Sequence, residues 1–433
     1  MSAGMQYVDV EEGTLKGSQR EGYSVFYSVP YAAPPVGKGR FAPPGKPQHY
    51  DGIRNAESVC SRPWMKDPDA ASAVGMEFYF APNFLPPFSE DCLHLHVWTP
   101  ARSADEKLPV AVWIHGGAFE KGYGTEIEID GEGFCRRGVI LVSVEYRVGI
   151  FGFFCHPELA REQGGRCGNY GTLDQLAALQ WIRRNIAAFG GDPAKITLIG
   201  QSAGAISVLL LSCMKETEGA FRCAIMQSGA CYQGPVESLP ARMEGEALGE
   251  SFLRESRIHT IEELRAMPAA DIIEAAAQFK ARYGEQFTFW PVIGGHLIEH
   301  STDQSIEMGR LHRISYIVGY NADDFWDGGL AEGTGRFAEA AGRLGCRVYE
   351  YQFMRRPPAY RKGMYEGSYH SAEIWYVFET LRRSSRPFGS EDETTAARMA
   401  DAWCSFVKEQ KPDSFMGNKW KPRSGKRDVY RFE

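Results

Sequence analysis

A series of short, nearly continuous apolar runs, separated by segments with helical periodicity, constrains the fold of this chain most. The runs are rich in Val, Ile and Tyr and lie at 108–115, 139–146, 196–199, 224–227, 314–318 and 348–353. Near-continuous apolarity over this length is typical of strands buried on both faces of a parallel sheet. Strands that alternate with helices indicate βαβ units, so the pattern predicts an α/β protein.

The segments around these runs complete the predicted architecture. Residues 174–188 have the pattern of an amphipathic helix, and 239–282 are rich in helical patterns. Near the N-terminus, 23–29 and 93–98 alternate more clearly between apolar and polar residues, as half-buried antiparallel strands do. We therefore predict one α/β domain over 1–433. It has a mainly parallel central sheet, antiparallel N-terminal edge strands and a helical cap formed by 239–282.

Composition argues against several functions. The net charge is −7, whereas nucleic-acid binders show a basic stripe. Basic clusters at 382–386 and 419–427 are short and mixed, so we predict solvated faces there rather than polyanion sites. The N-terminus is polar and acidic and no run of 18 apolar residues exists, so we expect neither a secretion signal nor a membrane span. Ten scattered cysteines without a C-x-x-C pair favour free thiols in a reducing cytoplasm.

A candidate nucleophile lies in residues 200–204, which read Gly-Gln-Ser-Ala-Gly and match Gly-x-Ser-x-Gly. The motif alone is weak, because chance produces so short a pattern readily. Its context is specific: a buried strand at 196–199 leads into it and an apolar helix at 205–211 leaves it, as a nucleophile elbow requires. The sharp turn also needs small flanking residues, which the glycines and alanines supply. We predict that Ser202 is the nucleophile.

A glycine-rich turn after an earlier strand supplies candidates for an oxyanion hole. Residues 115–119 read His-Gly-Gly-Ala-Phe and follow the run at 108–115. In an elbow enzyme, one donor is the backbone N–H after the nucleophile, here Ala203, and the others come from such a turn. Each donor of this kind typically lowers the barrier by about 3–4 kcal/mol.

Chain order selects the general base. In α/β-hydrolases, which carry this kind of elbow, the acid and then the histidine follow the serine along the chain. His370 is the last of ten histidines and lies beyond the best acid candidates, in a polar loop after the apolar run at 348–353. The acid should follow the strand at 314–318, where Asp323, Asp324 and Asp327 compete and spacing does not choose among them. It would hold His370 in one tautomer and stabilise the imidazolium.

Together these motifs resemble the type-B carboxylesterase/cholinesterase family of the α/β-hydrolase fold. The resemblance covers nearly the whole chain, and its motifs lie at 29–37, 40–41, 89–95, 113–119, 146–149, 168–175, 189–193, 200–204, 227–229 and 370–373. It implies that Asp324 is the triad acid and that the oxyanion hole consists of the N–H groups of Gly117, Ala118 and Ala203. It also implies a disulfide pair, Cys60–Cys92, which we expect to be reduced in the cell but near enough to oxidise. Finally, it implies two structural ion pairs, Arg40–Glu90 and Arg147–Asp174.

Three departures from the family pattern bear on specificity. Gln201 stands where the family usually has Glu, which removes an attraction for cationic substrates such as choline esters. Ala118 replaces a glycine, and its methyl group narrows that side of the hole. His370 follows Asp324 by only 46 positions, where family members usually carry a longer helical insertion. We therefore expect a wider, more solvent-open pocket and a weaker helical dimer surface, hence a monomer or weak homodimer.

These features predict a serine carboxylic-ester hydrolase that cleaves small to medium uncharged esters through an acyl-enzyme. The expected partner is a small-molecule ester, with no nucleic acid or membrane, and the chemistry needs no metal or cofactor. Candidate pocket residues are Phe119, Gln201, Trp290 and Trp326, and core packing is an equal alternative for the three aromatic residues. An amidase or other acyl-transfer enzyme is one alternative, and a non-catalytic binding protein on the same fold is another. The presence of all three triad residue types argues against the second.

Overall fold

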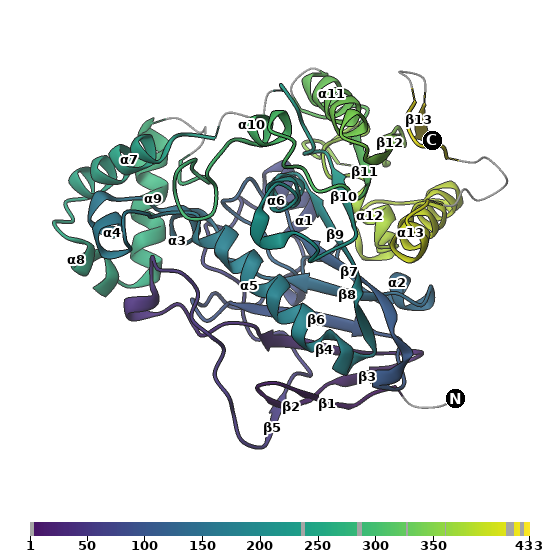
Figure 1. Cartoon of the computed structure of the whole chain (residues 1–433), viewed down its shortest axis with the longest axis horizontal. Coiled ribbons are helices and arrows are strands. Elements are labelled where there is room, and N and C mark those ends of the chain that lie inside the picture. The colour runs from purple at the N-terminus through teal and green to yellow at the C-terminus, as the bar shows by residue number, and fades with distance from the viewer. Residues whose placement is uncertain are drawn as a thin grey trace.

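The structure is a computed structural model that describes residues 4–234, 239–283, 288–325, 328–359, 361–412, 420–424 and 428–433. Among them, ten strands form one sheet in the order β13-β12-β11-β10-β9-β7-β8-β6-β4-β3, which runs through the centre of the molecule (Figure 1). They are β3 (Ser18–Arg20), β4 (Tyr23–Pro30), β6 (His94–Thr99), β7 (Leu108–Ile114), β8 (Ile140–Val144), β9 (Gly191–Gln201), β10 (Cys223–Gln227), β11 (Ser315–Asn321), β12 (Arg347–Phe353) and β13 (Val429–Phe432).

The sheet is parallel from β8 to β13 and antiparallel at its N-terminal edge. β7 pairs in parallel with β8 and β9, and the pairs from β9 through β13 are also parallel. β6 runs antiparallel to β8 and β4, and β4 runs antiparallel to β3. The predicted mainly parallel sheet with antiparallel N-terminal strands is therefore confirmed.

Helices cover the sheet and close a core on each face. They are α1 (Ala73–Phe78), α2 (Glu132–Arg136), α3 (Gly149–Phe153), α4 (Pro157–Glu162), α5 (Tyr170–Asn185), α6 (Ala203–Leu211), α7 (Arg242–Glu255), α8 (Ile261–Ala266), α9 (Ala269–Tyr283), α10 (Thr302–Glu307), α11 (Gly329–Arg343), α12 (Ile374–Val377) and α13 (Ser390–Glu409). Along β7, Val112 and Ile114 belong to the core shared with α5 and α6, whereas Ala111 and Trp113 belong to the core shared with α12 and α13. This alternation follows from the two-residue period of a strand, and it explains why both faces needed apolar residues.

A second, small sheet lies beside the N-terminal strands and was not predicted. It contains β1 (Tyr7–Val10), β2 (Gly13–Lys16) and β5 (Ile53–Asn55), in the order β1-β2-β5. These strands are three or four residues long and largely polar or exposed. Segments of that kind carry little hydrophobic periodicity from which a strand can be predicted.

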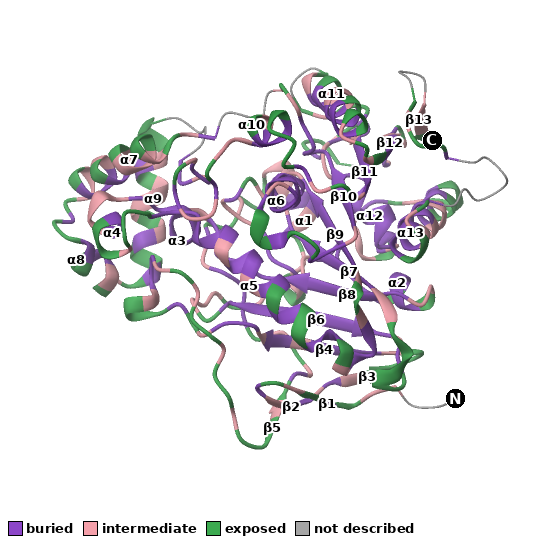
Figure 2. Cartoon of the chain, in the orientation of Figure 1, coloured by how far each residue is buried: buried purple, intermediate pink, exposed green. Residues whose placement is uncertain are grey.

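The segment predicted as a cap is helical, as its periodicity indicated. It forms α7, α8 and α9, which lie together with α3 and α4 at one end of the molecule (Figure 1). Their outer faces are exposed, while the central strands are buried (Figure 2). Arg40 ties this segment to the N-terminal region, because its guanidinium donates to the carbonyl oxygen of Met267 at 2.7 Å. That the segment caps the site stays a prediction.

Both predicted structural ion pairs are present. The Arg147 guanidinium donates to both oxygens of the buried Asp174 carboxylate at 2.7 Å, and Arg40 pairs with Glu90. The prediction of solvated faces was wrong for two arginines of the basic clusters. The Arg423 side chain is 8% exposed and pairs with Glu339 and Glu350, and Arg386 is not part of a solvated face either. Its guanidinium is buried against Glu77, with Nη2 2.7 Å from Oε2. Pattern alone could not reveal this pair, because its partners are far apart in the sequence. No helix among the described residues is long and apolar enough to cross a bilayer.

Candidate active site

The turn between β9 and α6 holds Ser202 in a strained backbone conformation. Ser202 has φ 54° and ψ −125°, outside the regions that a non-glycine residue ordinarily adopts. The turn needs glycine on both sides. A Cβ on Gly200 would lie 2.3 Å from the carbonyl oxygen of Gly204, and one on Gly204 would lie 2.1 Å from that of Ile114. The chain thus presents the serine hydroxyl at the end of a central strand, as a nucleophile elbow does.

Two loops that follow separate strands bring His370 and Asp324 together. The Nδ1 atom of His370 is hydrogen-bonded to Oδ1 of Asp324. The second carboxylate oxygen, Oδ2, accepts from the Ser228 hydroxyl at 2.7 Å and from the Asn321 backbone N–H at 3.0 Å. The carboxylate is therefore fixed on both oxygens, and it orients the imidazole. Ser228 lies in one of the family-like motifs, but its contact with the acid was not predicted.

The other acid candidates have different surroundings. Asp323 is half exposed and accepts from the Ser368 backbone N–H at 2.7 Å. Its carboxylate lies 3.8 Å from the Arg356 guanidinium, so it fixes the loop that carries His370. Asp327 lies outside the described residues.

The electrostatics of the pair suit a general base. Burial favours the neutral imidazole, but the charge and hydrogen bond of Asp324 outweigh this and raise the pKa of His370 above its ordinary value. Burial likewise opposes ionisation of Asp324, but His370 and the fixed donors lower the pKa of the carboxyl. The buried Glu373 carboxyl adds to the negative field at His370. Glu373 is itself held by the Gln227 and Asn321 side-chain amides at 3.1 and 2.6 Å.

The remaining ring nitrogen of His370 contacts Gln201. The Nε2 atom of the Gln201 amide lies 3.2 Å from Nε2 of His370, and Gln201 is buried. With the Nδ1 proton directed at Asp324, the unprotonated Nε2 accepts this amide hydrogen. Gln201 was predicted as a pocket residue. It lines the cavity beside Ser202, and it also contacts the atom that would take the Ser202 proton.

The turn after β7 presents backbone N–H groups near the serine. Gly117, Ala118 and Phe119 have φ of 102°, 57° and 58°. At Gly117 a Cβ would lie 2.1 Å from the Lys121 carbonyl oxygen, so glycine is required there. Within the described part of the chain, no backbone carbonyl accepts from the N–H of Gly117, Ala118 or Ala203. These three donors are available to an incoming oxygen.

A cavity of about 190 Å³ joins these groups. Its walls are mostly aromatic and aliphatic, with the nucleophile, the histidine and the glycine-rich turn at one end. It is lined by Val74, Phe78, Tyr79, Trp113, Gly116, Gly117, Ala118, Lys121, Glu126, Glu128, Gln201, Ser202, Phe325, Tyr365, His370, Ser371 and Ile374. The half-exposed Phe325 ring stacks on His370, with ring centroids 4.5 Å apart.

Two carboxyl groups in this cavity were missed by sequence reasoning. Glu126 accepts from the Tyr79 hydroxyl at 2.8 Å, whereas Oε2 of the buried Glu128 has no hydrogen-bond partner. Burial, with Glu145 nearby, raises the pKa of Glu126 to about 8, and burial beside Glu126 raises the pKa of Glu128. Glu126 therefore largely holds its proton near neutral pH, and the raised pKa of Glu128 likewise reduces the negative charge of this wall. The sequence does carry a signal for these two carboxyls, because acidic residues alternate with isoleucines along 126–130, just after the glycine-rich turn.

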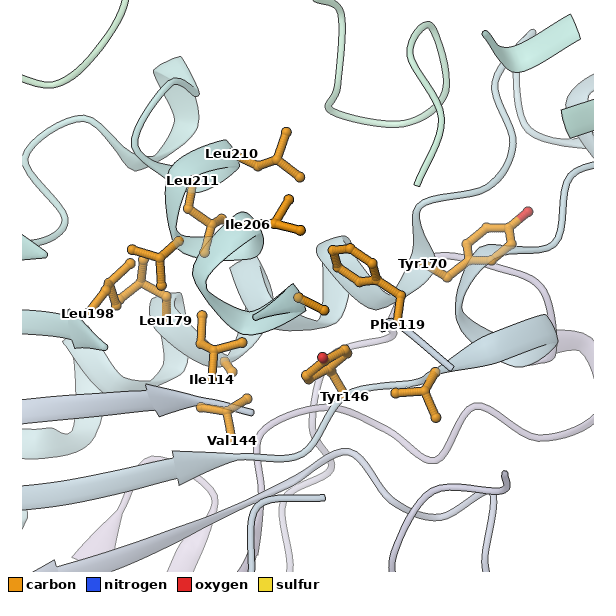
Figure 3. Close-up of a cluster of buried hydrophobic side chains, with 14 of the residues drawn as sticks. Ile114, Phe119, Val144, Tyr146, Tyr170, Leu179, Leu198, Ile206, Leu210 and Leu211 are labelled. Carbon is orange, nitrogen blue, oxygen red and sulfur yellow. The ribbon is translucent and has the colours of Figure 1, made fainter. Parts of the chain in front are cut away.

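One aromatic pocket candidate, Phe119, packs in the core, and another, the partly buried Trp290, packs against it. The positive φ of Phe119 turns its ring inward, where Figure 3 shows it beside α6 and near Tyr146. It meets Trp290 edge to face, with ring centroids 5.2 Å apart. Neither residue is among those that line the cavity beside Ser202, so contact of either one with substrate stays a prediction. Trp326 lies outside the described residues.

Comparison with known proteins points to one family. The family model described as "Carboxylesterase family" matches residues 5–328 and 327–432. The chain is 30% identical to para-nitrobenzyl esterase of Bacillus subtilis, over 94% of this chain and 91% of that protein. It is 29% identical to fumonisin B1 esterase of Sphingopyxis macrogoltabida, over 96% of this chain and 84% of the relative. A solved para-nitrobenzyl esterase structure superposes with a TM-score of 0.84 at 28% identity, covering 96% of this chain and 93% of the other.

Proposed function

The chain belongs to the carboxylesterase family of α/β-hydrolases and is an ester-hydrolysing enzyme, and we propose that Ser202, His370 and Asp324 perform the hydrolysis through an acyl-enzyme. The observation that carries this proposal is the hydrogen bond between His370 and Asp324 in the same cavity as the strained serine turn. A side chain held in a costly backbone conformation is a mark of a functional site.

The residues divide the work of acyl transfer in two steps. His370 accepts the Ser202 proton as the hydroxyl oxygen attacks the ester carbonyl carbon, and Asp324 stabilises the imidazolium. His370 then protonates the leaving alcohol oxygen. In the second step, His370 takes a proton from water, the water oxygen attacks the acyl carbon, and the Ser202 oxygen leaves and regains a proton.

The backbone N–H groups of Gly117, Ala118 and Ala203 stabilise the tetrahedral oxyanion of each step. Their availability in the described structure supports this role. Donors that are fixed before reaction cost no reorganisation when the charge develops, which makes this contribution large. The methyl group of Ala118 leaves its N–H in place.

The contact of Gln201 with His370 bears on the first proton transfer. Its amide occupies Nε2 of His370 in the resting geometry, and that nitrogen must be free to accept the Ser202 proton. We propose that the Gln201 amide moves aside or shares this nitrogen with the Ser202 hydroxyl when substrate binds. The uncharged amide also leaves out the negative charge that the family pattern places there.

We propose small to medium uncharged esters as substrates, because the cavity is compact and mostly apolar, and burial raises the pKa of the two carboxyls that line it. The test compares p-nitrophenyl esters of increasing acyl length with the matching p-nitroanilides. The esters should be hydrolysed much faster than the anilides. Ser202→Ala should abolish the activity. Ser371→Ala is the matched control, because it also replaces a serine in the cavity. Faster anilide cleavage would instead favour an amidase.

Location and assembly remain proposals. All ten cysteines lie within the described residues as free thiols, which is typical of a reducing compartment such as the cytoplasm. We also propose a monomer or weak homodimer. Cell fractionation and sedimentation analysis check these points, and a secreted or tightly dimeric enzyme would contradict them.

A further inference from the structure

A second cluster of reactive side chains lies where the segment after β5 meets the start of β6, apart from the cavity beside Ser202. Cys60 is exposed, and its Sγ lies 3.8 Å from Nδ1 of His94 and 3.6 Å from the Ser61 hydroxyl. On the far side of the ring, Nε2 of His94 lies 3.3 Å from Oδ1 of Asp91, an ion-pair distance. The imidazole is buried and Asp91 is half exposed. A thiol, an imidazole and a carboxylate therefore follow one another.

The charges of this cluster favour an ionised thiol. Partial burial opposes ionisation of Cys60, but His94 and the neighbouring hydroxyls outweigh it and lower the pKa of the thiol to about 7. Burial disfavours the charged ring of His94, but Asp91 and Cys60 raise its pKa to about 9. Arg54 contributes a positive charge beside Asp91. Thiolate and imidazolium thus stabilise each other near neutral pH.

The other half of the expected cysteine pair behaves in the opposite way. Cys60 and Cys92 are both free thiols, so the family-like disulfide is not formed here. Cys92 is buried, and burial together with the charges of Asp174 and Glu145 raises the pKa of its thiol. Cys167 also has a lowered pKa, but it is buried and reagents do not reach it. Among the ten cysteines, Cys60 combines exposure with an ionised sulfur.

We propose that Cys60, with His94 and Asp91, forms a nucleophilic thiol site that reacts with low-molecular-weight disulfides. In the reaction, the Cys60 thiolate attacks one sulfur of the disulfide, the S–S bond of that disulfide breaks, and a mixed disulfide forms on Cys60. The other half leaves as a thiolate, which takes a proton from water. The modification requires no residue of the ester-hydrolysing site.

The test uses the intact enzyme and an aromatic disulfide, dithiobis-nitrobenzoate, whose leaving thiolate absorbs light. We expect one cysteine to react in a fast phase, and peptide mapping to place the adduct on Cys60. The fast rate should reach half its maximum near pH 7, whereas an ordinary thiol with a pKa of about 8.5 does so at that higher pH. The midpoint is a better readout than the rate at pH 7. The nucleophilicity of a thiolate falls as its pKa falls, with a Brønsted slope of about 0.4–0.5. At pH 7 the reaction of Cys60 should therefore be only about threefold faster than that of an ordinary thiol.

Variants separate the cluster from a merely exposed cysteine. Cys60→Ser should remove the fast phase, and Cys92→Ser should keep it. His94→Gln should move the midpoint upward by about one pH unit or more, because the imidazolium is lost. Retained ester hydrolysis in each variant shows that it is folded.

Several results would overturn the proposal. They are a fast phase that survives Cys60→Ser, a wild-type midpoint at pH 8.5 or above, and an unchanged midpoint in His94→Gln. A Cys60–Cys92 disulfide found by mapping protein whose free thiols were blocked at lysis would also overturn it. The wild-type midpoint needs no variant, so a His94→Gln protein that fails to fold does not leave the proposal untested.

Discussion

Restoring a carboxylate at position 201 should move the acidic limb of the pH–rate profile. In the structure the Gln201 amide nitrogen lies 3.2 Å from Nε2 of His370. Gln201→Glu would place a carboxylate at nearly the same distance from the imidazolium. Two unit charges about 4 Å apart attract by about 4 kcal/mol at an effective dielectric constant of about 20. Burial of the new carboxylate offsets part of this attraction.

If only a third of that attraction survives, about 1.4 kcal/mol remains, which is one pKa unit. Because the pKa of His370 is already above its ordinary value, and the base works only when neutral, the acidic limb should move at least about one unit toward higher pH. The assay is kcat/KM for a neutral p-nitrophenyl ester between pH 5 and 10 at constant ionic strength.

Gln201→Met is the matched control, because it removes the amide without adding a charge. Its acidic limb should not move toward higher pH. The reasoning would be refuted if the folded Gln201→Glu enzyme kept the wild-type limb or moved it to lower pH. That result would mean that position 201 does not act on His370.

Three further predictions follow from the charges and packing. Asp324→Asn should lower kcat by about 10⁴-fold, since the imidazole loses its orienting partner. The pH–rate profile of any residual activity should have its acidic limb at lower pH. A loss of kcat below tenfold would contradict the role of Asp324 as the triad acid. Asp174→Ala should lower the free energy of unfolding in urea by about 3–5 kcal/mol, because it leaves the buried Arg147 charge uncompensated; a change within 1 kcal/mol would count against this. The raised pKa of Glu126 means that this carboxyl binds more protons in the folded than in the unfolded state, so its contribution to the free energy of unfolding should fall as pH rises from about 4.5 to about 8. Glu126→Gln should therefore gain stability relative to wild type between pH 6 and pH 9 in denaturant titrations, and an equal difference at both pH values would refute the assignment.

The sequence predicted the features that follow from local pattern. The six apolar runs correspond to the six parallel strands from β7 to β12, because burial on both faces leaves a continuous apolar signal. The glycines around Ser202 were predicted from the turn, and the backbone contacts at Gly200 and Gly204 give the reason. His370 could be chosen by chain order alone, whereas the choice of Asp324 needed the family resemblance.

Features that depend on distant residues could not be predicted. The contact of Gln201 with His370 joins residues 169 positions apart. The burial of Arg386 depends on Glu77, 309 positions away. The inward turn of Phe119 depends on backbone angles that its sequence does not specify. The arrangement of Cys60, His94 and Asp91 likewise arises only when the loop after β5 packs on β6.

Active-site labelling tests the role of Ser202 most directly. A phosphonofluoridate reacts with an activated serine and leaves a stable adduct, which peptide mass mapping can locate. We predict one adduct per chain, on Ser202, with loss of ester hydrolysis in proportion to labelling, and no labelling of Ser202→Ala. An adduct on another residue, or full activity in Ser202→Ala, would contradict the account.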